Sequence, residues 1–185
     1  QRSERESFIS STTENFFVIY MADISQHQNN STPPPFLVRF FATGFFSGYF
    51  PFAPGTAGSA VGLLIYWIPN FENTIILSAC TAIMLAIGIV VSGKMEHCYG
   101  EDPPIVVIDE VVGMWITLLL LPKSIIMSVA AFLLFRIFDI IKPPPARNLE
   151  ALKNGWGIML DDVMAGIYGN LVLQLLLKLA PQIFV

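Results

Sequence analysis

One stretch of this sequence, residues 74–92, is mostly apolar and contains no charged side chain. A helix needs about 20 such residues to cross the hydrocarbon core of a bilayer, so this stretch predicts a membrane-spanning helix. The composition agrees with that prediction. Hydrophobic residues make up 54% of the 185 residues and charged residues only 13%, whereas an average soluble domain is about a quarter charged.

The other apolar segments predict further helices. They cover residues 36–50, a short run that ends at Trp67, and the stretches 106–121, 125–141 and 158–179. The first two are too short to cross a bilayer upright, so we expect them to be tilted, broken or re-entrant. No useful period-two alternation occurs, which argues against strands. We therefore predict an all-α fold, a multi-pass membrane helical bundle with a short or re-entrant first helix pair.

The chain divides into two parts. Residues 1–35 are polar apart from a short apolar patch at 16–21, and they end in three prolines. We expect this part to be a flexible N-terminal tail. Residues 36–185 hold all the long apolar segments and are expected to form one membrane domain.

Within residues 135–169, four charged residues lie inside the apolar stretches rather than in the linker that joins them. Arg136 and Asp139 lie near the end of one apolar stretch, and Asp161 and Asp162 lie near the start of the next. Charges inside such segments are costly and persist mainly where they face a partner, a cavity or an ion. A spacing of three also allows a simple ion pair between Arg136 and Asp139. That pair leaves the adjacent aspartates unexplained.

Alternating helix directions bring the unusual polar residues to one side of the membrane. If each apolar segment crosses in turn, segment 51–59 and the loop after residue 92 lie on the same side. The helix that starts with Asp109 and Glu110 then begins there, and the helix that ends near Lys142 finishes there. Scattered structural salt bridges would not be expected to share one face. The alternation therefore predicts a common site.

These residue types suit a metal-assisted phosphoryl site. Mg²⁺ prefers carboxylate oxygens, usually one or two together with water and a substrate phosphate. Arginine holds phosphate through a bidentate fork and lysine through a point charge, which suits Arg136 and Lys142. Segment 54–59 precedes a predicted helix, so its backbone N–H groups and the hydroxyls of Thr56 and Ser59 could hold an anion. Alone, the segment fits a capped turn equally well.

Several other functions fit the sequence poorly. The net charge is −4 and there is no basic run, so we do not expect the chain to bind nucleic acid. Cys80 and Cys98 lack metal-like spacing, and Cys98 beside His97 is weak evidence for a metal or catalytic cysteine. The sequence also lacks the motifs of other phosphatase classes. It has no cysteine followed by a phosphate loop that ends in arginine, no Asp-x-Asp nucleophile pair and no phosphatase site built from two histidines. No obligatory protein partner is evident.

Three longer motifs carry a family resemblance: FFSGYFPFAPGTAGS, VIDEVVGMWITLLLLP and FRIFDIIKPPPARNLEALKNGWGIMLDDVMAG. Together they resemble the phosphatidylglycerophosphatase A family. The resemblance implies a Mg²⁺-dependent phosphatase of the bacterial inner (cytoplasmic) membrane. Its substrate would be a phospholipid in the bilayer, phosphatidylglycerophosphate, which it converts to phosphatidylglycerol. It also implies an active face on the cytoplasmic side, where the lipid precursor is made.

The resemblance further implies a role for each candidate residue. The metal ligands would come from an acidic set: Asp109, Glu110, Asp139, Asp161 and Asp162. The catalytic residues would be four of these: Asp109, Glu110, Asp139 and Asp162. The phosphate contacts would be Arg136, Lys142, Thr56 and Ser59.

The residues leave two alternatives open. The phosphate is attacked either by water activated at the metal or by one aspartate. A protein of another class also fits, a small membrane carrier or ion-binding protein whose acidic cluster holds a proton or a cation near the bilayer midplane. A carrier needs its charges at the centre of the membrane. The depth of the acidic residues therefore separates the two hypotheses.

Overall fold

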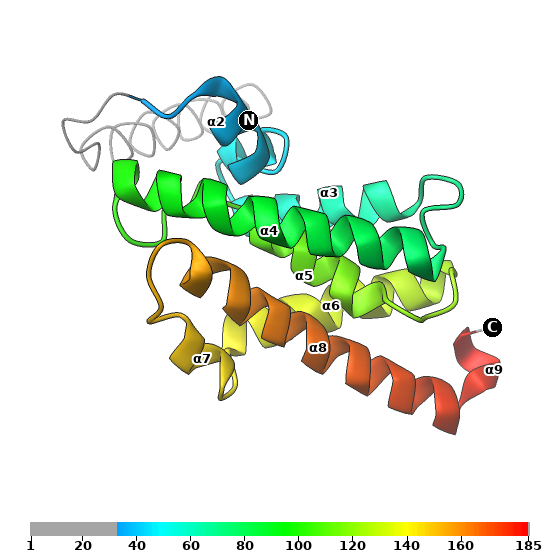
Figure 1. Cartoon of the computed structure of the whole chain (residues 1–185). Helices are drawn as coiled ribbons and strands as arrows, with labels where there is room; N and C mark the ends of the chain where they lie inside the picture. Colours follow the sequence, from blue (N-terminus) through cyan, green and yellow to red (C-terminus); the bar gives the residue numbers. More distant parts are fainter. Residues whose placement is uncertain (1–32, 185) are drawn as a thin grey trace, which may run out of the picture.

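A computed structural model describes residues 33–184 of the chain. Every regular element in this range is a helix (Figure 1), which confirms the all-α prediction for the described residues. The predicted N-terminal tail lies outside them except for Pro33, Pro34 and Pro35.

The bundle is built from five longer helices, and short ones flank them. The longer helices are α3 (Pro54–Tyr66), α4 (Thr74–Tyr99), α5 (Ile108–Leu118), α6 (Ile125–Ile141) and α8 (Trp156–Leu179). The short ones are α2 (Phe36–Ala42), the 3-10 helix η1 (Ser47–Tyr49), α7 (Ala146–Leu149) and α9 (Pro181–Phe184). Helix α6 has the predicted bounds, and the others agree with the apolar segments within a few residues at most ends.

Helix α4 is one exception, because it continues to Tyr99 although a loop was expected after residue 92. Tertiary contacts hold these last turns in the helix. Met95 is fully buried, and the carboxylate of Glu96 accepts a 2.8 Å hydrogen bond from the backbone N–H of Gly155, just before α8. The helix ends at Gly100, whose positive φ of 96° suits glycine.

Helix α5 forms the centre of the bundle. It packs against α3, α4, α6 and α8, and all its residues except Glu110 and Ile116 are buried. Gly166 of α8 allows the two helices to approach closely, since a Cβ added there would lie 2.6 Å from the carbonyl oxygen of Gly113 on α5. Small residues on the facing sides of α5 and α8 therefore let the two helices pack closely.

Two described helices, α4 and α8, are long and apolar enough to cross a membrane. They run along the length of the molecule on either side of α5 (Figure 1). Both expose large apolar side chains, among them Ile75 and Ile83 on α4 and Leu171 and Leu179 on α8. By contrast, the 11 residues of α5 span only about 17 Å, short of the roughly 30 Å of a hydrocarbon core.

Candidate active site

A cavity of about 220 Å³ gathers the ends of four helices. The starts of α3, α5 and α8 and the end of α6 meet around it, which is the arrangement that alternating helix directions predicted. All seven charged candidate residues line it: Asp109, Glu110, Arg136, Asp139, Lys142, Asp161 and Asp162. The cavity is also lined by Asp102, from the loop between α4 and α5.

Three of the carboxylates form a tight group. Asp109, Glu110 and Asp162 each offer one oxygen atom, and these atoms lie within 4.8 Å of one another. One oxygen on each side chain is buried and has no hydrogen-bond partner within residues 33–184: Asp109 Oδ1, Glu110 Oε2 and Asp162 Oδ2. Buried anionic oxygens without partners are costly unless a cation neutralises them. Their oxygen-only chemistry and spacing fit a hard divalent ion such as Mg²⁺.

The other two predicted metal ligands face cations instead. Asp139 Oδ2 lies 2.7 Å from Arg136 Nη1, the ion pair that the spacing of three allowed. Asp161 Oδ2 lies 2.7 Å from Lys142 Nζ, and Asp161 Oδ1 accepts the backbone N–H of Asp162. The structure thus brings three of the five carboxylates together and pairs the remaining two with the phosphate-type cations.

The guanidinium of Arg136 is held from several directions. Besides its ion pair with Asp139, Nη1 lies 3.9 Å from Glu110 Oε1 and donates a 3.5 Å hydrogen bond to Ser59 Oγ. The side chain is largely buried, yet it still lines the cavity. This geometry fixes the guanidinium beside the group of three carboxylates.

Lys142 lies where α6 ends, in the left-handed backbone conformation (φ 46°). Its ammonium contacts Asp161 on α8 and also lies 3.0 Å from Glu150 Oε1, just after α7. Burial alone would lower the pKa of Lys142, but the contacts with Asp161 and Glu150 outweigh it and raise that pKa above its ordinary value. The lysine is therefore a permanent positive charge at the edge of the cavity.

Segment 54–59 was expected to be a loop ahead of a helix, and that prediction was wrong because the segment forms the first turns of α3. The side chain of Thr56 is exposed, and Ser59 is fully buried. The Ser59 hydroxyl donates a 2.9 Å hydrogen bond to the Gly55 carbonyl. Pro54 and Gly55, rather than Thr56 and Ser59, line the cavity. Phosphate contact by the two hydroxyls stays a prediction.

Sequence reasoning missed Asp102 and Glu150. Both lie in polar connections that are rich in charge, where no periodic pattern marks one acidic residue over its neighbours. Asp102 has a positive φ of 46°, and only the folded loop shows that it reaches the cavity. Glu150 could have been suspected only from the short helix α7, which the proline-rich sequence did not predict.

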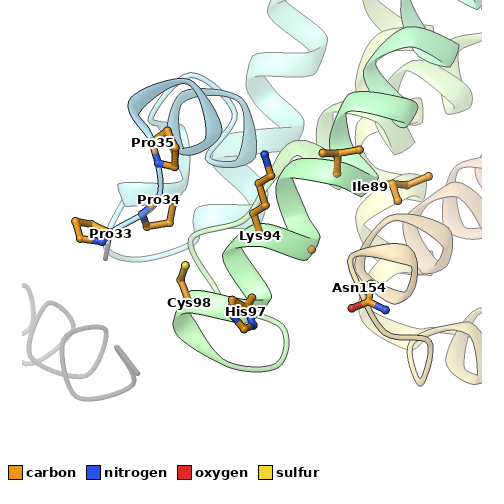
Figure 2. Close-up of a pocket in the computed structure, with 10 residues that line it drawn as sticks. Pro33, Pro34, Pro35, Ile89, Lys94, His97, Cys98 and Asn154 are labelled. Carbon is orange, nitrogen blue, oxygen red and sulfur yellow. The ribbon is translucent and has the colours of Figure 1, made fainter. Parts of the chain in front are cut away.

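His97 and Cys98 belong to a different pocket. Figure 2 shows them near Lys94 on the last turns of α4, facing the Pro33–Pro35 segment. This pocket has a volume of about 510 Å³, and none of the described residues that line it is acidic. The structure therefore gives no support to a metal site at this pair.

Comparison with known proteins gives consistent results. A sequence model of the family described as "Phosphatidylglycerophosphatase A" matches residues 40–177. A Bacteroides thetaiotaomicron protein named "Putative phosphatidylinositol-3-phosphatase" is 43% identical over 148 residues, which cover 76% of this chain and 93% of that protein. The phosphatidylglycerophosphatase A of Escherichia coli is 37% identical, covering 68% of this chain and 75% of that protein.

The corresponding protein of Haemophilus influenzae, also named phosphatidylglycerophosphatase A, is 40% identical over 139 residues. The match covers 73% of this chain and 85% of that protein. No solved structure matches the chain significantly. The matched range contains every residue that lines the cavity.

Proposed function

The chain belongs to the phosphatidylglycerophosphatase A family of lipid phosphatases, and we propose that it hydrolyses phosphatidylglycerophosphate to phosphatidylglycerol and phosphate. The observation that supports this proposal most directly is the cavity itself. Three carboxylates with unpartnered oxygens lie there beside two cations of the kind that bind phosphate. We further propose that the enzyme acts at the cytoplasmic face of a bacterial inner membrane.

Asp109, Glu110 and Asp162 would hold one Mg²⁺ ion, because their oxygens lie close together and one oxygen of each has no hydrogen-bond partner among the described residues. When bound, the ion would neutralise charge on the phosphate and act as a Lewis acid. Asp139 and Asp161 would hold Arg136 and Lys142 in place. These two cations would bind the phosphate oxygens and orient the scissile bond.

A carrier or ion-binding protein is the competing class. Its acidic residues should lie near the middle of the bundle, where both sides can reach them. Here Asp109 and Glu110 lie in the first turn of α5, and Lys142 lies at the end of α6. Charges at one end of the helices favour an enzyme that meets its substrate at one face.

A second lipid substrate has specific support. The Bacteroides thetaiotaomicron relative, at 43% identity, is named as a phosphatidylinositol-3-phosphatase. Phosphatidylinositol 3-phosphate also carries a phosphate monoester on a lipid headgroup, so the same cations and carboxylates would serve it. The headgroup is then glycerol in one case and inositol in the other.

The test is phosphate release by the purified full chain in detergent micelles, with each lipid in parallel and with or without Mg²⁺. We expect Mg²⁺-dependent release from phosphatidylglycerophosphate with a higher kcat/KM than for phosphatidylinositol 3-phosphate. The reverse ratio would assign the chain to the inositol lipid. No release from either lipid would reject both proposals. An Asp162→Asn variant controls for contaminating phosphatase.

A further inference from the structure

The pocket between the last turns of α4 and the Pro33–Pro35 segment, which we call the α4 pocket, plays no part in the proposed reaction. It shares no described lining residue with the active-site cavity. Its volume of about 510 Å³ lies in the range of pockets that bind small molecules. Figure 2 shows Lys94 and His97 on α4, between the prolines and Asn154. The pocket is therefore large enough to hold a ligand of its own.

One face of α4 leads from the exposed apolar part of the helix into this pocket. Val90, Lys94 and His97 follow one another at spacings of four and three residues, so they lie on the same side of the helix. Ile83, seven residues before Val90, lies on that side too. Ile83 is 60% exposed and Val90 is 57% exposed. An apolar strip thus ends in a lysine and a histidine, the order in which a phospholipid presents its acyl chains and its phosphate.

The length of α4 places Lys94 at the edge of a bilayer. The helix begins at Thr74, and Lys94 lies about 30 Å farther along it, the thickness of a hydrocarbon core. Residues 74–92 carry no charge, so Lys94 is the first charged side chain of the helix. A lysine at this depth extends its ammonium to the level of the lipid headgroups.

The charge of the α4 pocket favours an anionic headgroup. None of its described lining residues is acidic, and the exposed Lys94 forms no ion pair within residues 33–184. In the active-site cavity, by contrast, each cation has a carboxylate at 2.7 Å. The ammonium, an imidazole and the amide of Asn154 together offer hydrogen-bond donors to a phosphate group. Basic pockets beside membrane-spanning helices bind acidic lipid headgroups in this way.

We propose that the α4 pocket is a second lipid site, which binds an anionic phospholipid through its phosphodiester group. The phosphodiester contacts Lys94 and His97, and the acyl chains follow the apolar face of α4 past Val90. The site lies on the same side of the membrane as the active-site cavity, because the loop directly after α4 contributes Asp102 to that cavity. The inference does not depend on which lipid the enzyme hydrolyses.

Native mass spectrometry of the purified full chain in detergent micelles tests the proposal. The competing probes are phosphatidylglycerol and the zwitterionic phosphatidylethanolamine, with identical acyl chains. The wild type should retain phosphatidylglycerol preferentially. Lys94→Gln removes the positive charge and His97→Glu places a negative charge beside it, so each should lower this retention at least about fivefold, the scale of one lysine near an anionic lipid surface. Excess inorganic phosphate should not displace the lipid, because it makes no contact with the apolar face.

Two further variants control for binding elsewhere on the molecule. Lys178→Gln removes an exposed lysine from the last turn of the other long apolar helix, α8. Lys142→Gln removes a cation from the active-site cavity. Both should keep the wild-type preference for phosphatidylglycerol, and circular dichroism checks that every variant is folded.

Wild-type retention of phosphatidylglycerol in Lys94→Gln would overturn the inference, and if that variant does not fold, His97→Glu decides in its place. Equal retention of the two lipids by the wild type, or displacement by inorganic phosphate, would also overturn it. Loss of the lipid in Lys142→Gln but not in Lys94→Gln would place the lipid in the active-site cavity instead. No retained lipid in the wild type would reject the site and leave residues 1–32, which lead into Pro33, as the occupant to test.

Discussion

The ammonium group of Lys142 lies 2.7 Å from the carboxylate of Asp161 and joins the end of α6 to the second turn of α8. The other cation of the cavity, Arg136, is likewise paired with Asp139 at 2.7 Å. Each of the two cations thus has one carboxylate at 2.7 Å. Each also has a second carboxylate farther away, Glu150 at 3.0 Å from Lys142 and Glu110 at 3.9 Å from Arg136. Among the described residues, no cation lies as close to the remaining acidic group, Asp109, Glu110 and Asp162, whose ion pair is the 3.9 Å contact of Glu110 with Arg136. This imbalance is the basis of the first two predictions.

We expect activity to require a divalent cation. EDTA in excess should abolish phosphate release, and added Mg²⁺ should restore it, because the three clustered carboxylates need a positive charge between them. The fold should survive, since α5 and α8 pack through apolar and small residues. Circular dichroism checks helix content in the same samples. Full turnover in EDTA would contradict the metal assignment.

Asp162→Asn should lower activity at least about 100-fold, the upper end of what even indirect support of a metal site costs. The metal-free variant should melt at the same or a higher temperature than the wild type, because a buried carboxylate oxygen without a partner is replaced by a neutral group. A purely structural role predicts the opposite, a clear loss of stability. Glu101→Gln changes an acid that does not line the cavity and should leave activity unchanged.

Arg136→Lys should be a poor substitute although it retains the charge. The guanidinium contacts Asp139 and Ser59 while still lining the cavity, and a lysine cannot reproduce that fork. We expect kcat/KM to fall at least about tenfold, the scale of one charge-assisted hydrogen bond. Arg147→Lys, on α7 and outside the cavity, is the matched control. Wild-type turnover in Arg136→Lys would show that a single positive charge suffices.

The apolar pattern predicted the helices, and their alternating directions predicted which ends meet. The bounds of α6 and the gathering of Asp109, Arg136 and Asp162 follow from these two features alone. Both depend on burial and chain direction, which a sequence displays directly.

Segment 54–59 shows why the rest could not be predicted. Glycine and serine are poor helix formers, so the sequence favoured a loop. The segment is helical because its glycines let α3 pack closely against α5 and the residues just before it. Gly58, for example, lies directly against Val107. The contribution of Asp102 and the contact of Glu150 with Lys142 likewise depend on tertiary packing of connections that have no periodicity.

Lys142→Met should destabilise the protein more than Glu150→Gln. Removing the lysine leaves the Asp161 side chain, only 7% exposed, without its cation, at a cost of about 2 kcal/mol. The Glu150 side chain is 44% exposed, so its loss should cost less than about 1 kcal/mol. Thermal unfolding in micelles compares the two. Equal losses would show that Asp161 does not depend on this lysine.

The same ion pair fixes a pH dependence. Pairing raises the pKa of Lys142 in the folded state, so its contribution to stability is complete below the unfolded-state pKa of about 10.4. That contribution is lost only as the pH rises through the higher folded-state pKa. Between pH 8 and pH 10 the stability difference between wild type and Lys142→Met should therefore stay constant.

The arrangement of helix ends predicts which loops share a side of the membrane. The starts of α3 and α8 meet at the cavity, whereas at the other end of the bundle Lys123 bonds to Glu72, joining the loop after α5 to the loop after α3.

We replace Cys80 and Cys98 and introduce single cysteines at three exposed positions, Thr56, Ala151 and Pro69. A membrane-impermeant maleimide should label Thr56→Cys and Ala151→Cys from one side of sealed vesicles and Pro69→Cys only from the other. Phosphate, metal and water must reach one mouth, because a bilayer blocks charged groups from crossing. If Thr56→Cys and Ala151→Cys were labelled from opposite sides, the start of α3 could not belong to the acidic site, and the phosphate contacts predicted for Thr56 and Ser59 would be wrong.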